Sequence, residues 1–176
     1  MEIWKDKRKK SLRGMRVRYV NDDLRKEIQQ LINTGPSSWR KMFKQQGLSE
    51  TPKVKDVLET LLEKTAGGKD AGPRGEAKYR PPQNVRKEAM KGIRLSHKFN
   101  YPSYNGIGLT RAIQLVVMDK IWERSINRMY RFFIRNQRYK SYKGFGDDEK
   151  PSRSYLSWLV WGGDSGYQWS KNMLNK

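Results

Sequence analysis

The chain has 176 residues, of which 35% are hydrophobic, and a formal net charge of +20. This is enough for one domain with a small appendage, and the core must be lean and rely on aromatic side chains. With no cysteine and a single histidine, disulfides, thiolate metal sites and paired-imidazole sites are excluded, whereas the charge favours a polyanionic partner.

A basic arm is expected over residues 1–20, which hold 8 basic and 2 acidic side chains. Its densest run is Lys7, Arg8, Lys9 and Lys10. Such a run is typical of a nucleic-acid-binding tail, although a solvated chain end has the same composition. Residues 15–19 alternate between polar and apolar side chains, which is compatible with a short strand or an extended segment.

Three short helices are predicted within a small unit that spans residues 21–66. Asn21 is suited to cap the first helix, Ser37 or Ser38 to cap the second, and apolar spacing predicts a third over about residues 52–65. The unit holds 8 basic and 7 acidic side chains. Because these charges nearly cancel, a packing or interaction role is favoured over DNA reading.

A linker is predicted over residues 67–80, which are rich in glycine, proline and charge, and a helical domain with glycine-rich loops follows over residues 81–176. Its first helix covers about residues 83–98. One face of this helix carries a basic stripe with spacings of 4, 3 and 4 residues, made of Lys87, Lys91, Arg94 and Lys98. Small side chains on the opposite side suit close backbone packing.

Five arginines on one face of a single predicted helix are the strongest functional signal. Their spacing of 4, 3, 4 and 3 residues confines them to an arc of about 80°, and they are Arg124, Arg128, Arg131, Arg135 and Arg138. The opposite side is apolar, formed by Trp122, Ile126, Met129 and Phe133. The arc contains no acidic residue, so this face is expected to bind an anion, and phosphate suits the arginine fork well.

The surroundings of this helix add further expectations. Thr110 is expected to cap a preceding helix that is either continuous with the arginine helix or bent near Asp119. The arginine stripe is flanked by Tyr130, Tyr139 and Tyr142. These rings would stack on bases if the strands were open. Pairing of the stripe with acidic residues of the chain itself, such as Asp147, Asp148 and Glu149, is the main alternative.

A last core helix is expected after Ser152, and then a turn formed by Trp161, Gly162, Gly163 and Asp164. We interpret this turn as structural: the glycines let the chain reverse, Trp161 fills the core and Asp164 caps a final helical turn.

Catalytic and metal sites are poorly supported. The three carboxylates at residues 147–149 match no calcium-loop spacing, and the pair of Glu149 and Lys150 lacks the upstream carboxylate that a nuclease needs. His97 is expected to be partly buried or at the surface. We therefore expect no enzyme activity, no metal and no cofactor.

The second half of the chain resembles a small uncharacterised domain found in proteins of tailed bacteriophages and large DNA viruses, some of them virion-associated. The resemblance covers roughly residues 81–170, and the matching positions include Pro81-Pro82, Gly108-Leu109-Thr110-Arg111-Ala112, Phe132-Phe133-Ile134-Arg135 and Trp158-Leu159-Val160-Trp161-Gly162-Gly163-Asp164. The family often has His-Glu after the Phe-Phe-x-Arg motif, whereas Asn136-Gln137 stand here. The resemblance implies a viral context but no established activity.

The sequence thus predicts a mainly α protein that binds nucleic acid, with DNA as the expected form, without catalysis. We expect it in a virion or in the host cytoplasm, neither secreted nor membrane-spanning, because the longest apolar runs, at residues 113–118 and 156–161, are too short to cross a bilayer. A minor capsid or scaffold-type protein that docks on acidic protein surfaces is the first alternative. A nucleic-acid-processing enzyme is the second.

Overall fold

The computed structural model describes residues 20–66, 77–101 and 106–175. The predicted mainly α fold is confirmed. The helices of the first part are α2 (Asp22–Asn33), α3 (Ser37–Gln45) and α4 (Val54–Ala66). Those of the second part are α5 (Gln83–Lys98), α6 (Ile107–Val117), α7 (Glu123–Asn136), the 3-10 helix η2 (Gln137–Ser141), α8 (Arg153–Val160) and α9 (Gly163–Leu174).

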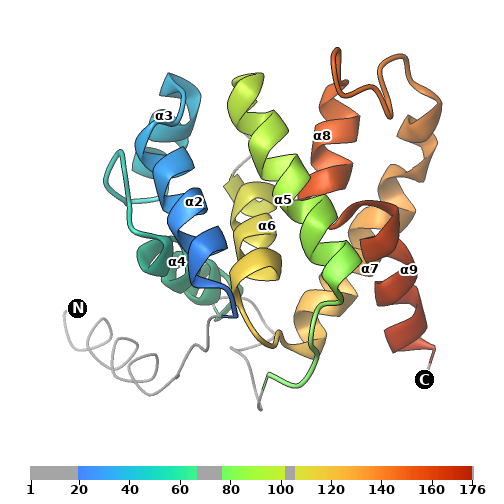
Figure 1. The fold of residues 1–176 in the computed structure, drawn as a ribbon. Helices are drawn as coiled ribbons and strands as arrows, with labels where there is room; N and C mark the ends of the chain where they lie inside the picture. Colours follow the sequence, from blue (N-terminus) through green and yellow to red (C-terminus); the bar gives the residue numbers. More distant parts are fainter. Residues whose placement is uncertain (1–19, 67–76, 102–105, 176) are drawn as a thin grey trace.

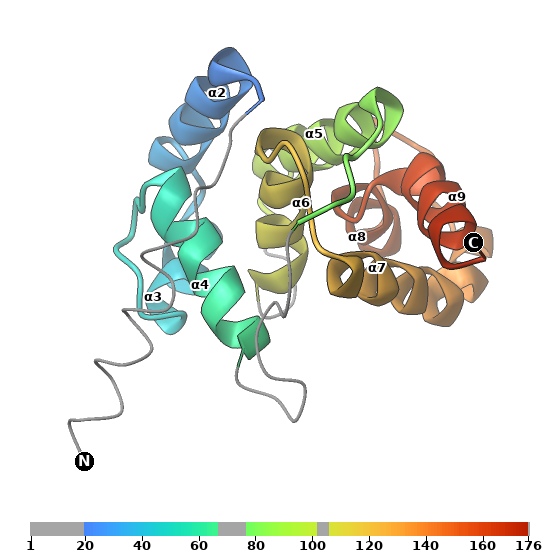
Figure 2. The same ribbon diagram turned by 90° about the horizontal axis from the view of Figure 1, so that it is seen from below.

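The helices form two groups on either side of α5 and α6. Figures 1 and 2 show α2, α3 and α4 on one side of this central pair and α7, α8 and α9 on the other. Helices α2 and α4 pack against α6, α8 packs against α5, and α9 packs against both α5 and α7. Buried apolar residues form one cluster that extends from Ile28 in α2 to Trp169 in α9. The predicted unit at residues 21–66 and the helices after the linker therefore share a core.

Two helix starts follow the predicted capping chemistry. The Asn21 side chain accepts a hydrogen bond from the backbone N–H of Leu24 at 3.0 Å. The hydroxyl of Ser152 accepts one from the N–H of Tyr155 at 3.1 Å. In both cases a side-chain oxygen satisfies a donor that the first helical turn leaves open.

Other predicted caps are wrong. Helix α3 begins at Ser37 with Pro36 at the cap position, and the Ser38 hydroxyl bonds to Asn100 instead. Helix α6 begins three residues before Thr110, after Gly106, whose φ of 73° lies in the left-handed region that favours glycine. Thr110 is buried inside the helix, and its hydroxyl donates to the Gly106 carbonyl at 2.8 Å.

The arginine helix is separate from the helix before it. After α6 the chain is extended, and Ile121 forms an antiparallel bridge with Tyr79, at the end of the predicted linker. Helix α7 then ends at Asn136, and Arg138 lies in η2. The prediction that Arg138 shares one α-helix with the other four arginines is therefore wrong.

The helical part of the C-terminal segment is also longer than predicted, and its cap differs. Instead of a final turn, α9 is a helix of 12 residues that follows Gly162 and Gly163, whose φ values are 105° and 62°. Asp164 is not its cap: the carboxylate accepts hydrogen bonds from Lys140 Nζ at 2.6 Å and from Trp158 Nε1 at 3.0 Å. Trp161 is half-buried and packs against the core rather than filling it.

Candidate nucleic-acid interface

Helix α7 has one fully buried side, as its apolar spacing predicts. Ile126, Met129 and Phe133 are each 0% exposed, and Trp122, just before the helix, is 8% exposed. Because these positions lie opposite the arginine arc, burying them turns the arginines toward the surface. The orientation of the basic face is therefore fixed by the core of the protein.

Aromatic contacts hold this helix against α8 and α9. The ring of Phe132 stacks on Trp161 with centroids 4.6 Å apart, and Phe133 meets the edge of Trp158 at 4.7 Å. Tyr130 stacks on Tyr167 of α9 at 6.3 Å. Such pairs add to the burial energy and restrict rotation of the helix, so the basic face is presented by a well-anchored element.

Arg131 and Arg135 form the most accessible part of the stripe. Both are exposed, and neither takes part in an ion pair within the described ranges. Arg124 and Arg128 are half-buried, and each makes an interaction within the molecule. The outer face of α7 therefore keeps uncompensated positive charge at its C-terminal half.

Arg138 extends this charge onto η2. Its guanidinium donates a hydrogen bond to the Tyr139 hydroxyl at 2.8 Å and lies 4.9 Å from the centre of that ring. The hydrogen bond to Tyr139 raises the pKa of Arg138 above its usual value. Tyr139 also meets Tyr142 edge-on at 5.2 Å, and Tyr142 is 58% exposed. Of the three tyrosines predicted to stack on bases, Tyr142 is the most open, whereas Tyr130 is already stacked within the protein.

The stripe on α5 is largely engaged inside the molecule. Lys91 Nζ lies 2.8 Å from Asp148 and donates to the Tyr155 hydroxyl at 3.1 Å. Arg94 forms a bidentate ion pair with Glu27 of α2: its guanidinium donates hydrogen bonds to the two carboxylate oxygens at 2.7 and 2.9 Å. These contacts raise the pKa of both cations and lower that of both carboxylates.

The remaining predicted contacts differ in accessibility. Lys87 is exposed, and Lys98 is exposed with its ammonium 5.1 Å from the centre of the Phe99 ring. The basic run of the arm, Lys7, Arg8, Lys9 and Lys10, lies outside the described residues. Among the predicted contacts that the structure describes, Arg131, Arg135 and Arg138 are exposed close together along α7 and η2.

The carboxylates that an enzymatic site would need are occupied separately. Asp164 binds Lys140, Asp119 binds Arg80 at 3.0 Å, and Asp147 accepts hydrogen bonds from the backbone N–H groups of residues 149 and 150. In residues 20–66, 77–101 and 106–175, no group of three or more metal-binding side chains occurs. His97 is half-buried with its ring edge-on to Trp39 at 5.6 Å.

Two buried arginines were not recognised from the sequence. Arg86 is 7% exposed and Arg111 is 1% exposed. Nothing in their spacing distinguishes them from surface arginines, because their burial depends on how α5 and α6 pack.

Across the described segments, no helix is both long and apolar enough to cross a membrane.

Searches of protein families, of curated proteins and of solved structures find no match to this chain.

Proposed function

We propose that this protein binds nucleic acid through the outer face of α7 and η2, without base-sequence preference and without catalysis. The observation that carries the proposal is the pairing of a fully buried apolar side of α7 with exposed, uncompensated arginines opposite it. A cluster of like charges is unfavourable unless a polyanion lies against it. Arginine also matches phosphate geometry better than lysine does.

The dimensions of the surface agree with this role. From Arg131 to Arg135 the helix rises about 6 Å, close to the axial length of about two nucleotides of one strand. Phosphate contacts made by guanidinium groups carry no sequence information, so we expect binding driven by counterion release. The resemblance of residues 81–170 to a viral domain that is sometimes found in virion-associated proteins is the motive for expecting a role on a packaged genome.

The test is a triple variant, Arg131→Gln with Arg135→Gln and Arg138→Gln. Binding to duplex and to single-stranded DNA would be measured at several salt concentrations. We expect affinity to fall with salt, and the slope of log affinity against log salt to be lower in the variant by about 2 to 3 units for duplex DNA, at ~0.9 per lost phosphate contact.

A matched control removes three exposed charges elsewhere, through Arg40→Gln, Lys41→Gln and Arg153→Gln. It should bind nearly as the unmodified protein does. If both variants keep the original slope, α7 is not the interface. If the protein self-associates strongly and shows no salt-sensitive binding of DNA, docking on acidic protein surfaces replaces the proposal.

A further inference from the structure

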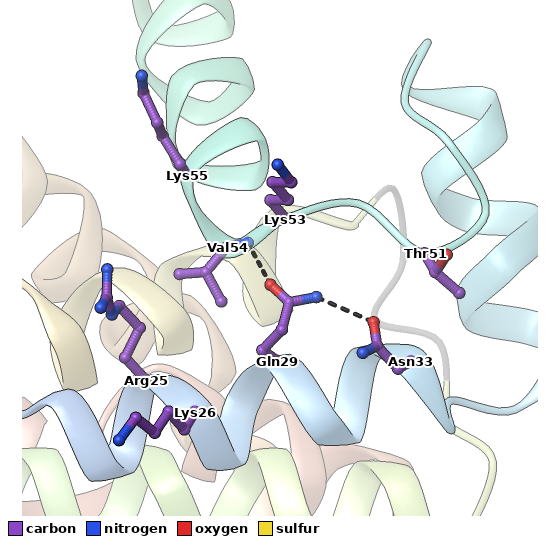
Figure 3. Close-up of a pocket in the computed structure, with 8 residues that line it drawn as sticks. All are labelled: Arg25, Lys26, Gln29, Asn33, Thr51, Lys53, Val54 and Lys55. Carbon is purple, nitrogen blue, oxygen red and sulfur yellow. Dashed lines mark hydrogen bonds between the residues drawn. The ribbon is translucent and has the colours of Figure 1, made fainter.

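A second basic surface lies in the N-terminal helices. A groove of about 650 Å³ is formed between α2 and the start of α4 (Figure 3). Its cationic lining consists of Arg25 and Lys26 from α2, Lys53 just before α4, and Lys55 in its first turn. Among the residues that the structure describes, no acidic side chain lines the groove.

The side chain of Gln29 lies between the two helices that form the groove and is held there by hydrogen bonds. Its amide nitrogen donates to the Pro52 carbonyl at 3.1 Å and to the Asn33 side chain at 3.0 Å, and its amide oxygen accepts from the N–H of Val54 at 2.9 Å. Figure 3 shows this side chain between the two helices. Since these bonds connect α2 to the start of α4, the cations are held on a defined frame rather than on a free loop.

The charge of the groove is only partly compensated. Arg25 pairs with Asp22 at 3.0 Å and Lys55 with Glu59 at 3.6 Å, but all four side chains are substantially exposed, so both pairs are weak. Lys26 and Lys53 form no ion pair with any described residue. At least two positive charges therefore remain to bind an anion.

The acidic side chains of this unit explain why the groove could not be read from the sequence. Glu27 faces α5 and binds Arg94, whereas Glu50 binds Lys44 on α3. The segment has 8 basic and 7 acidic residues, and the fold distributes them unevenly: Glu27 and Glu50 pair away from the groove, whereas four of the cations line it and only two of these four pair with a carboxylate. A sum over the segment conceals this separation.

The lining chemistry selects the ligand. Sites for small organic molecules bury most of the ligand surface in a concave pocket, whereas this groove is open and four cationic side chains line it. Clustered lysines act as point charges for phosphate oxygens. The groove also lies on the opposite side of α5 and α6 from α7, as Figures 1 and 2 show, so a segment bound along α7 does not extend into it.

We propose that the groove binds the phosphate backbone of a second nucleic-acid segment, so that one molecule bridges two segments. This inference rests on the proposed function of α7. The physical consequence is that one protein joins two duplexes without having to dimerise.

The experiment compares four proteins. They are the unmodified chain, a groove variant (Lys26→Gln with Lys53→Gln), the α7 variant defined above, and the combination of both. Each is added to duplex DNA on beads, and capture of a second, fluorescent duplex is measured together with binding to the immobilised duplex. The double variant Arg40→Gln with Lys41→Gln, in the same helical unit, is the matched control. Thermal unfolding checks that each variant is folded, as expected for exposed substitutions.

We expect the groove variant to keep most of its binding to the immobilised duplex and to lose about fivefold or more of the captured duplex. The combined variant should bind less than the α7 variant does, with a salt slope lower by about 1.8 for two lost contacts. The control should capture the second duplex normally.

The possible failures are distinguishable. Equal capture by the groove variant and the unmodified protein overturns the inference while leaving α7 intact. If the α7 variant binds as the unmodified protein does, the proposed function fails instead. If soluble polyglutamate binds in a manner that depends on Lys26 and Lys53, while bridging is unchanged in the groove variant, the groove is a protein-docking site and the inference is wrong.

Discussion

Two buried arginines have very different surroundings. Arg86 donates hydrogen bonds to four backbone carbonyls at 2.8 to 3.2 Å, those of Pro81, Leu115, Val116 and Asp119. Two of these carbonyls belong to the last turn of α6, where a positive charge is also favoured by the helix dipole. Arg86 therefore closes the end of a helix, and these bonds offset part of the cost of its burial, which still lowers the pKa of Arg86 through desolvation.

Arg111 lacks that compensation. It donates to the side chain of Gln114 and lies 5.6 Å from the centre of the Trp161 ring, but its Nε has no hydrogen-bond partner. It forms no ion pair in the part of the chain that the structure describes. Burial, with a smaller contribution from the nearby charge of Arg128, lowers the pKa of Arg111 to about 9. The charged form is thus destabilising where it lies.

Replacing Arg111 by methionine is expected to raise the free energy of unfolding at neutral pH. An apolar side chain of similar length removes the desolvation cost of the charge. The expected gain is about 1 to 4 kcal/mol, the range found when buried ion pairs are replaced by apolar side chains. Arg86→Met is the control, and it should lower stability by about 3 kcal/mol because four carbonyls lose their donor. Urea denaturation measures both. A loss of stability in Arg111→Met as large as that in Arg86→Met would show that the Arg111 charge is stabilising.

The pH dependence provides a second readout of the same substitution. In the folded state the pKa of Arg111 is about 9, well below its usual value in an unfolded chain. Below pH 9 both states carry the proton, so the full penalty applies. Above pH 9 the folded state releases the proton first, and the penalty decreases as pH rises toward the unfolded pKa. The stability advantage of Arg111→Met should therefore shrink by about 1 kcal/mol between pH 7 and pH 10.

At the scale of elements, the backbones of α5 and α8 approach each other closely at Gly92. A Cβ added at Gly92 would lie 2.7 Å from the backbone nitrogen of Val160 and 2.8 Å from the carbonyl carbon of Leu159. The small side chains on this side of α5 were predicted to allow close backbone packing, and this is confirmed. The crossing also brings Lys91 to Tyr155 and so uses part of the α5 stripe within the fold.

Gly92→Ala tests this crossing. Alanine favours a helix over glycine by about 1 kcal/mol, yet the added methyl group meets backbone that cannot move aside, so we expect a net loss of about 1 to 3 kcal/mol. Gly47→Ala is a useful comparison, since no atom lies within 4 Å of the added Cβ there but φ is +78°. It should cost about 1 kcal/mol from backbone strain alone. Stabilisation by Gly92→Ala would mean that the two helices are further apart.

Some features of the helices follow from local sequence and were predicted, whereas others depend on distant contacts or backbone conformation and were not. Periodicity correctly separated the buried and exposed sides of α7, because each side is decided within one helix. Caps made by side chains, at Asn21 and Ser152, were also found. The start of α6 was missed because its cap is Gly106 in a left-handed conformation while a better hydrogen-bonding residue, Thr110, follows. The pair of Arg94 and Glu27 joins residues 67 positions apart, which no spacing rule detects.

At the scale of the whole molecule, the net charge of +20 opposes the compact state. The ion pairs in the described segments are mostly between exposed groups and are individually weak. Repulsion among the remaining cations acts over longer distances and is screened as the Debye length falls from about 30 Å at 0.01 M salt to about 10 Å at 0.1 M. Added salt should therefore weaken the repulsion among the cations more than it weakens the attraction within the ion pairs, and so stabilise the folded protein.

The thermal midpoint should consequently rise with sodium chloride between 10 and 200 mM, by a few degrees, since about 1 kcal/mol corresponds to roughly 2 to 4 °C for a chain of this size. Duplex DNA at 10 mM salt should raise it further, because a ligand that binds only the folded state stabilises by about 2.7 kcal/mol at a hundred times its Kd. The α7 variant should show a smaller DNA effect but, with three fewer charges, a higher midpoint without DNA. A midpoint that falls with salt would show that ion pairs outweigh repulsion, and the net charge would then cease to argue for an anionic partner.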